Sequence, residues 1–123
     1  METKFPPCFR ILNRRTGETL ADRAMKAESF AERARGLLGR RSIDCGEGLW
    51  IEPCSSIHMF FMRFAIDAVF VDRQGKVTRA VSNLRPWRIA FGGRGARAVL
   101  ELHAGTIAAS GTRVGDVLDL DSV

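Results

Sequence analysis

The sequence predicts a mainly β (α+β) protein, a small β-sandwich or partly open barrel of short, mostly antiparallel strands with one amphipathic helix packed on it. Three observations predict this fold class: two hairpin signals, a succession of short runs rich in Val, Ile and Phe, and one segment with helical periodicity. The chain has 123 residues, 46% of them hydrophobic, which suffices for one core. We therefore expect a single domain over residues 1–123.

Short apolar runs separated by turn residues predict the strands. In chain order they cover 8–13, 19–25, 48–51, 56–60, 67–71, 76–81, 98–102 and 117–121. Gly17 supplies the positive φ that a tight loop between the first two runs needs, and the turn from Asp72 to Gly75 makes a second hairpin. A helical turn is expected at 106–109, ended by Gly111.

One segment has the period of an amphipathic helix, which we place at about 29–39. Its apolar face consists of Phe30, Ala34, Leu37 and Leu38. Ser29 and Glu32 have the spacing of a capping box at its start, and Gly39 follows its last apolar residue. These signals predict both ends of the helix.

The cysteine pattern indicates a cytoplasmic protein with free thiols. Cys8, Cys45 and Cys54 are odd in number and contain no CxxC pair, and the amino end has no basic leader followed by an apolar run. A zinc site would need Cys45, Cys54, His58 and His103 to converge, but no pair has finger-type spacing. The longest apolar stretch, 57–71, is too short and too charged to cross a bilayer. We expect no metal, no cofactor and no membrane segment.

Segment 57–72 carries the candidate functional site, because polar side chains interrupt an otherwise apolar run. We expect a pocket that binds a small ligand, anions included, or a peptide, with these candidate residues: His58, Met62, Arg63, Asp67 and Glu101. The structural alternative is a sealed ion-pair cluster of Arg63, Asp67 and Glu101, with His58 as a core histidine. A catalytic alternative pairs Cys54 with His58, oriented by Asp67, but four residues along a strand separate the two side chains by roughly 13 Å.

The positive charge is concentrated in one segment, 73–100. The chain carries 19 basic and 14 acidic side chains, yet this segment contains seven basic residues and no acidic one. The candidate contacts for an anionic partner are Arg79, Arg85, Trp87, Arg88, Arg94 and Arg97. Aromatic rings among cations are typical of single-strand binders, so nucleic-acid binding is an alternative function. The structural alternative is a solvated loop whose Trp87 closes over the core.

Four sequence blocks, in order, resemble the domain of unknown function 192 family, also called uncharacterised protein family 0127. They are Arg35–Arg40, Ile57–Phe70, Val99–Gly105 and Gly115–Asp116. The resemblance implies a mainly β domain with one helix and a polar cluster around the central block, and it supplies no established activity. Ala65 stands where similar sequences often have proline.

These observations together favour a non-catalytic binding module with its site near 57–72. The partner is expected to be an unidentified small molecule or peptide, and the protein a monomer or weak homodimer.

Overall fold

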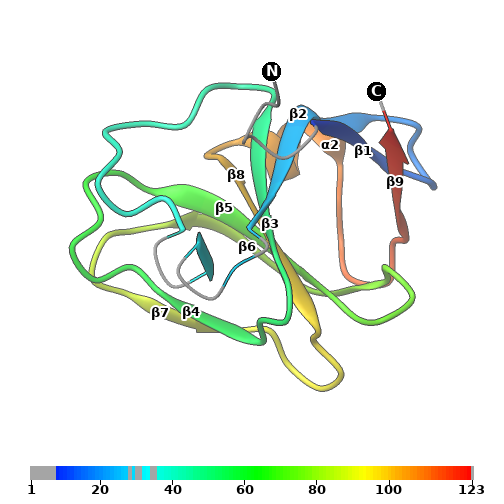
Figure 1. Ribbon diagram of the computed structural model, residues 1–123. Coiled ribbons are helices and arrows are strands. Elements are labelled where there is room, and N and C mark those ends of the chain that lie inside the picture. The colour runs from blue at the N-terminus through cyan, green and yellow to red at the C-terminus, as the bar shows by residue number, and fades with distance from the viewer. Residues whose placement is uncertain (1–7, 28, 30–31, 34–35, 123) are drawn as a thin grey trace.

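The computed structural model describes residues 8–27, 29, 32–33 and 36–122. In this part of the chain the strands are β1 (Phe9–Asn13), β2 (Thr19–Ala27), β3 (Glu47–Ile51), β4 (Ser56–His58), β5 (Ile66–Val71), β6 (Val77–Leu84), β7 (Ile89–Phe91), β8 (Ala98–His103) and β9 (Leu118–Ser122). The short helix α2 (Thr106–Ser110) follows β8. Seven strands form one long sheet, and β4 and β7 pair in a separate small one; Figure 1 shows their arrangement.

The long sheet is strongly curled and has the order β6-β5-β8-β3-β2-β1-β9. Only β2 and β3 pair in parallel; the other neighbours in this sheet are antiparallel. Its two edge strands approach each other where Lys76 bridges Val117, and the Val77 N–H donates to the Asp116 carbonyl at 2.7 Å. The predicted mainly β fold, a partly open barrel, is confirmed.

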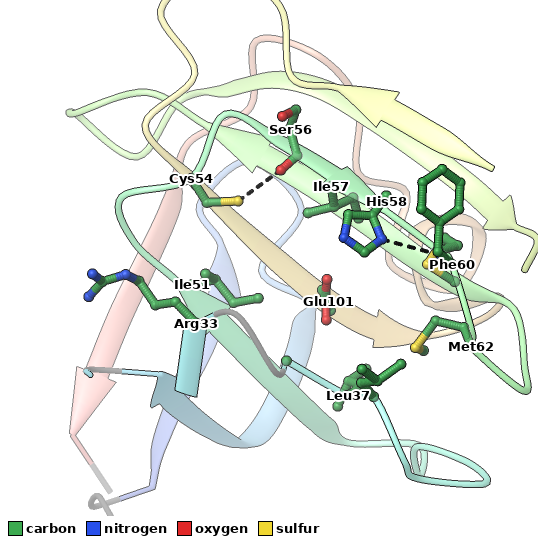
Figure 2. A pocket seen from close by; sticks show the side chains of 13 residues that line it. Arg33, Leu37, Ile51, Cys54, Ser56, Ile57, His58, Phe60, Met62 and Glu101 are labelled. Atoms are coloured by element: carbon green, nitrogen blue, oxygen red, sulfur yellow. Dashed lines mark hydrogen bonds between the residues drawn. The ribbon is translucent and has the colours of Figure 1, made fainter. Parts of the chain in front are cut away.

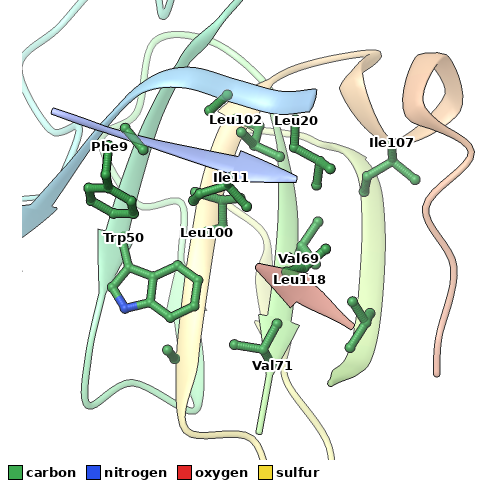
Figure 3. Close-up of a cluster of buried hydrophobic side chains, with 14 residues drawn as sticks. Phe9, Ile11, Leu20, Trp50, Val69, Val71, Leu100, Leu102, Ile107 and Leu118 are labelled. Atoms are coloured by element: carbon green, nitrogen blue, oxygen red, sulfur yellow. The ribbon is translucent and has the colours of Figure 1, made fainter. Parts of the chain in front are cut away.

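The central strands β5 and β8 are buried on both faces, so their side chains divide between two apolar clusters. Alternate residues of each strand point to opposite faces of a sheet. The cluster inside the curl (Figure 3) includes Phe9, Ile11, Leu20, Trp50, Val69, Val71, Leu100, Leu102, Ile107 and Leu118. The cluster on the outer face includes Leu37, Ile43, Ile51, Met59, Ile66, Ala68, Phe70, Ala90 and Val99. The small sheet and the segment around Leu37 thus cover the outer face of β5 and β8.

Two buried carboxylates, those of Asp67 and Asp116, accept hydrogen bonds from loop and strand-end residues and so fix the connections between elements of the curled sheet. Asp67 is fully buried and accepts three backbone N–H groups, from Asn83 at 2.9 Å, Gly105 at 3.1 Å and Ile107 at 2.8 Å. The Asp67 carboxylate thereby joins the start of α2 to the end of strand β6. Asp116 accepts from Arg15 Nε at 2.6 Å and from Asn13 Nδ2 at 2.9 Å, and these partners hold its pKa well below the usual range.

The sequence predicted both hairpins, and β1–β2 and β5–β6 confirm them. Gly17 has φ 75° and Gly75 has φ 81°, the positive values that these turns require. Strand β7, with three residues, was not predicted. Segment 57–72 contains parts of two strands, as the predicted runs 56–60 and 67–71 indicate, and the chain turns after β4, where Phe61 takes φ 65°.

The predicted helix over 29–39 falls partly on residues 30–31 and 34–35, which lie outside the described residues. Where the chain is described, its capping box is present. The Glu32 N–H donates to Ser29 Oγ at 3.0 Å, and the Ser29 N–H donates to Glu32 Oε1 at 2.9 Å. Glu32 and Arg33 are helical, and Leu37 is buried in the outer cluster as predicted.

Candidate functional site

Glu101 occupies a position on β8 where the fold otherwise places apolar side chains. Its cross-strand neighbours are Ala68 on β5 and Leu49 on β3, which belong to or pack against the outer cluster. The residue is only 7% exposed, and burial raises the pKa of its carboxyl to about 7. The described residues provide no hydrogen bond or ion pair to this carboxyl. A buried acid without a partner in a cavity is a candidate functional group.

The Glu101 carboxyl opens onto a cavity of about 170 Å³. Among the described residues no fully buried side-chain oxygen lacks a hydrogen bond, so neither oxygen of the Glu101 carboxyl is completely sealed. Figure 2 shows Glu101 between β4 on one side and Arg33 and Leu37 on the other. His58 and Met62 also line this space. We call it the Glu101 cavity.

Aromatic side chains extend from the rim of the Glu101 cavity across the small sheet. His58 and Phe60 stack with ring centroids 4.8 Å apart, and Phe61 lies 4.8 Å from Trp87. We call the exposed group the aromatic surface, and its members are Phe60, Phe61, Trp87, Ile89 and Phe91. Phe61, Phe91 and Trp87 are 70%, 63% and 59% exposed. Exposure of several large apolar groups on one face is typical of an interaction site.

The two turns that present these rings are joined through their backbones. The Met59 N–H donates to the Arg88 carbonyl, and the Trp87 N–H donates to the Met59 carbonyl, both at 2.7 Å. Phe61 and Trp87 have φ of 65° and 70°, which bulky residues rarely adopt. Strained backbone of this kind clusters at functional sites.

The structure brings together three of the five predicted pocket residues, His58, Met62 and Glu101. Arg63 is exposed and does not line the Glu101 cavity. Asp67 pairs across the strands with Leu102 of the inner cluster, so it lies on the opposite face of the sheet from Glu101. The predicted alternative, a sealed ion-pair cluster of Arg63, Asp67 and Glu101, is therefore wrong. The Asp67 carboxylate accepts hydrogen bonds from three backbone N–H groups instead.

Cys54 and His58 are not joined in the described structure. Cys54 Sγ donates to the Ser56 carbonyl at 3.1 Å, whereas His58 Nδ1 accepts from the Phe60 N–H at 3.3 Å. Burial, chiefly, and the nearby Glu101 charge raise the pKa of the Cys54 thiol. The geometry thus provides neither the thiol–imidazole hydrogen bond nor the lowered thiol pKa that the catalytic alternative needs.

A second cavity, of about 440 Å³, lies beside β2 and α2. The four residues considered for zinc are divided between this cavity and the Glu101 cavity. Cys45 and His103 line this second cavity, whereas Cys54 and His58 line the Glu101 cavity. Among the described residues, no three His, Cys, Asp or Glu side chains are grouped closely enough to hold a metal ion. Among the described residues that line these two cavities, Glu101 is the buried acid to which no hydrogen bond or ion pair is made.

The predicted anionic-partner residues are exposed, but two of the arginines have protein partners. Arg79 donates to the Phe91 carbonyl at 2.9 Å, and Arg97 Nε lies 3.6 Å from a Glu52 carboxylate oxygen. Arg85, Arg88 and Arg94 form no ion pair in the part of the chain that the structure describes. The suggestion that Trp87 closes over the core is wrong, since its ring is exposed in the aromatic surface.

Sequence reasoning missed most of the aromatic surface. Phe60 and Phe61 lie within the apolar stretch 57–71, and Phe91 lies in the basic segment 73–100, so neither pattern indicates that their rings are exposed. The available signal was the turn-like Arg85-Pro86-Trp87-Arg88, which places an aromatic residue where a chain reverses. A ring in such a turn has few neighbours to bury it.

Comparison with known proteins identifies similar chains. The family model DUF192, described as "Uncharacterized ACR", matches residues 11–120. A UPF0127 protein of Thermococcus sibiricus is 31% identical over 114 residues, covering 89% of this chain and 73% of that protein.

Two crystal structures have the same fold. A protein of unknown function from Novosphingobium aromaticivorans has TM-score 0.78 and 24% identity, over 91% of this chain and 83% of that one. A protein from Sinorhizobium meliloti has TM-score 0.80 and 23% identity, over 98% of both chains. None of the helices in the described residues has the length and apolar character needed to span a membrane.

Proposed function

Since the chain belongs to the DUF192 (UPF0127) family, whose description names no reaction, we propose a function from its site: non-catalytic binding of a cationic or hydrogen-bond-donating group in the Glu101 cavity. The observation that carries the proposal is the Glu101 carboxyl, buried on an apolar sheet face, without a described partner and open to the cavity. We further propose that the protein works in the cytoplasm, where its cysteines stay reduced.

The negative charge of the Glu101 carboxylate favours a ligand group that is cationic or donates hydrogen bonds. The carboxylate can only accept hydrogen bonds, and the guanidinium of Arg33 points away from it in Figure 2. A cation entering the cavity would pair with a carboxylate that burial otherwise destabilises, whereas an anion would be repelled. The expectation of an anionic ligand therefore applies to the surface arginines and not to this cavity.

The size of the Glu101 cavity favours one chemical group rather than a whole cofactor. Sites for drug-sized ligands span roughly 300 to 1,000 Å³, and this cavity has about 170 Å³. Leu37, Ile51 and Met62 provide apolar walls beside the carboxyl. An alkylammonium group, with an apolar stem and a charged end, matches both features.

We expect n-butylammonium to bind the protein saturably at pH 8, as followed by amide NMR shifts of the cavity residues. Affinity should rise between pH 6 and pH 8 as Glu101 loses its proton, and Glu101→Gln should lower it at least about tenfold, consistent with charge-assisted hydrogen bonds of 1.5–3 kcal/mol.

Glu18→Gln is the matched control, because it removes one exposed acid from the hairpin turn after β1. Butan-1-ol is the uncharged ligand control and should bind much more weakly. Equal butylammonium affinity for wild type and Glu101→Gln, or no saturation at all, would contradict the proposal.

A second candidate function is single-stranded nucleic-acid binding at the aromatic surface. Phe61 and Trp87 expose their rings, and Arg85 and Arg88 lie on the same turn as Trp87. Bases stack on such rings while arginines contact phosphates. The specific observation in its favour is the exposure of Trp87, which the sequence left open.

Anisotropy of a labelled twelve-nucleotide oligothymidylate tests this second function. Trp87→Ala should reduce affinity about 10-fold or more, as loss of one stacked base does, while Val114→Ala, at an exposed apolar residue elsewhere, should leave it unchanged. If two arginines contact phosphates, the affinity for the oligothymidylate should fall roughly sevenfold between about 50 and 200 mM salt. Absence of binding at low salt would rule the function out.

A further inference from the structure

The small sheet has two strands, and β4 is the one that borders the Glu101 cavity. Ser56 pairs with Phe91, Ile57 with Ala90 and His58 with Ile89. Beyond these pairs the Gly92 N–H donates to the Ser55 carbonyl at 2.8 Å, and the Met59 N–H donates to the Arg88 carbonyl. Antiparallel ladders alternate between bonded and non-bonded pairs. The backbone groups of Ser56 and His58 therefore point away from β7.

Strand β4 lies beside the Glu101 cavity, whose lining includes Ser56, Ile57 and His58. The Ser56 carbonyl accepts a weak donor, Cys54 Sγ. The Ser56 and His58 N–H groups have no protein partner within the described structure. An unpaired strand edge is a template for another strand.

On the opposite edge of the small sheet, side chains of β6 engage two backbone carbonyls. The Phe91 carbonyl accepts from Arg79 Nη1 at 2.9 Å, and the Gly92 carbonyl accepts from Thr78 Oγ1 at 2.8 Å. Residues of β6 thus bind the outer edge of β7. On the β4 edge no side chain of the described residues engages the outward N–H groups of Ser56 and His58, and both residues line the Glu101 cavity.

We propose that β4 binds an extended peptide as an added strand, which places a lysine or other cationic side chain of that peptide in the Glu101 cavity. This inference rests on the proposed function and names its ligand class. The backbone of the peptide would pair with Ser56 and His58, and the Glu101 carboxylate would select the side chain by charge. Strand addition commonly combines backbone pairing with pockets for alternate side chains.

The faces of β4 set the sequence pattern of the peptide. Ile57 packs against the outer cluster, toward the long sheet, whereas Ser56 and His58 are exposed on the other face with Ile89 and Phe91. Because a strand alternates its side chains, a residue directed at Glu101 has neighbours directed toward His58 and the aromatic surface. The favoured pattern is therefore apolar, basic, apolar.

Amide hydrogen exchange with the peptide Ac-Thr-Val-Lys-Val-Thr-NH2 tests the inference. At saturation, exchange of the Ser56 and His58 amides should slow at least about tenfold, because each gains a hydrogen-bond partner. The amides of Ile89 and Phe91 are the matched control, since they occupy the paired positions on the opposite edge and should not change. The same peptide with norleucine in place of lysine should bind at least about tenfold more weakly.

The variant Ser56→Pro separates strand addition from filling of the cavity. Proline removes an N–H that takes no part in the β4–β7 ladder, a substitution that edge strands tolerate. It should weaken binding of the lysine peptide at least about tenfold more than binding of butylammonium, which needs no backbone partner on β4. Should this variant fail to fold, the exchange measurement on wild type still decides.

The outcomes distinguish the two proposals. If butylammonium binds but the peptide does not slow amide exchange at Ser56 and His58, strand addition is overturned and the proposed function stands. Failure of both ligands to bind would overturn both proposals. Equal affinity for the lysine and norleucine peptides would overturn the charge selection by Glu101.

Discussion

Asp67→Ala is expected to lower the free energy of unfolding by about 3 to 4 kcal/mol, since an unsatisfied buried polar group costs roughly 1 to 3 kcal/mol. The substitution leaves three backbone N–H groups without their acceptor, at Asn83, Gly105 and Ile107. Ile107 is buried, so water replaces its lost bond poorly. The first turn of α2 and the end of β6 should loosen together.

Urea unfolding measures this effect, with Asp72→Ala as the matched control. Asp72 also accepts two backbone N–H groups, from Gln74 and Lys76 at 2.9 Å, but in an exposed hairpin turn. Water can replace its bonds there, so the control should lose less than about 1 kcal/mol. If the two variants were equally destabilised, burial would not be the reason for the importance of Asp67.

The sequence allowed prediction of the local elements because their signals are local. The positive φ at Gly17, the Ser29–Glu32 capping box and the turn beginning at Asp72 each act within a few residues. The alternation of short apolar runs sufficed for the fold class. Glu101 was included in the predicted site because its strand was expected to neighbour segment 57–72, and the pairing of β8 with β5 confirms that neighbourhood.

The face on which each polar residue lies was not predictable. Periodicity relates residues within one strand, but only the pairing of β5 with β8 shows that Asp67 and Glu101 face opposite ways. Strand β7 escaped prediction because Ile89 and Phe91, its larger apolar residues, are exposed and follow a turn at Trp87. These features depend on contacts between distant segments, which one sequence does not specify.

Glu101 should make the protein less stable as the pH rises, and Glu101→Gln should remove this dependence. The folded carboxyl has its pKa raised from 4.5 to about 7, so the folded state keeps its proton to higher pH than the unfolded state does. Stability from this group is complete below about pH 4.5, falls as pH rises toward 7, and is constant above that. The loss amounts to about 3 kcal/mol, at roughly 1.4 kcal/mol per pH unit.

Urea unfolding of wild type and Glu101→Gln at pH 5 and pH 8 isolates this contribution. Glutamine resembles the protonated acid, so the variants should differ little at pH 5, whereas Glu101→Gln should be more stable by about 3 kcal/mol at pH 8. The other ionisable groups that line the cavity are Arg33, Cys54 and His58. Because the His58 imidazole lines the same cavity, the comparison is repeated with His58→Asn in both proteins, and the difference should persist.

If Glu101→Gln stabilises the free protein, the cost of burying the Glu101 carboxylate and its proposed binding of a cation have the same origin. A carboxylate kept in an apolar cavity lowers the stability of the free protein, and a bound cation should restore it. Saturating butylammonium at pH 8 should therefore raise the unfolding free energy of wild type, and should do so far less for Glu101→Gln. If Glu101→Gln were instead less stable than wild type at pH 8, the carboxylate would have a stabilising role in the free protein, and its burial would not indicate a binding site.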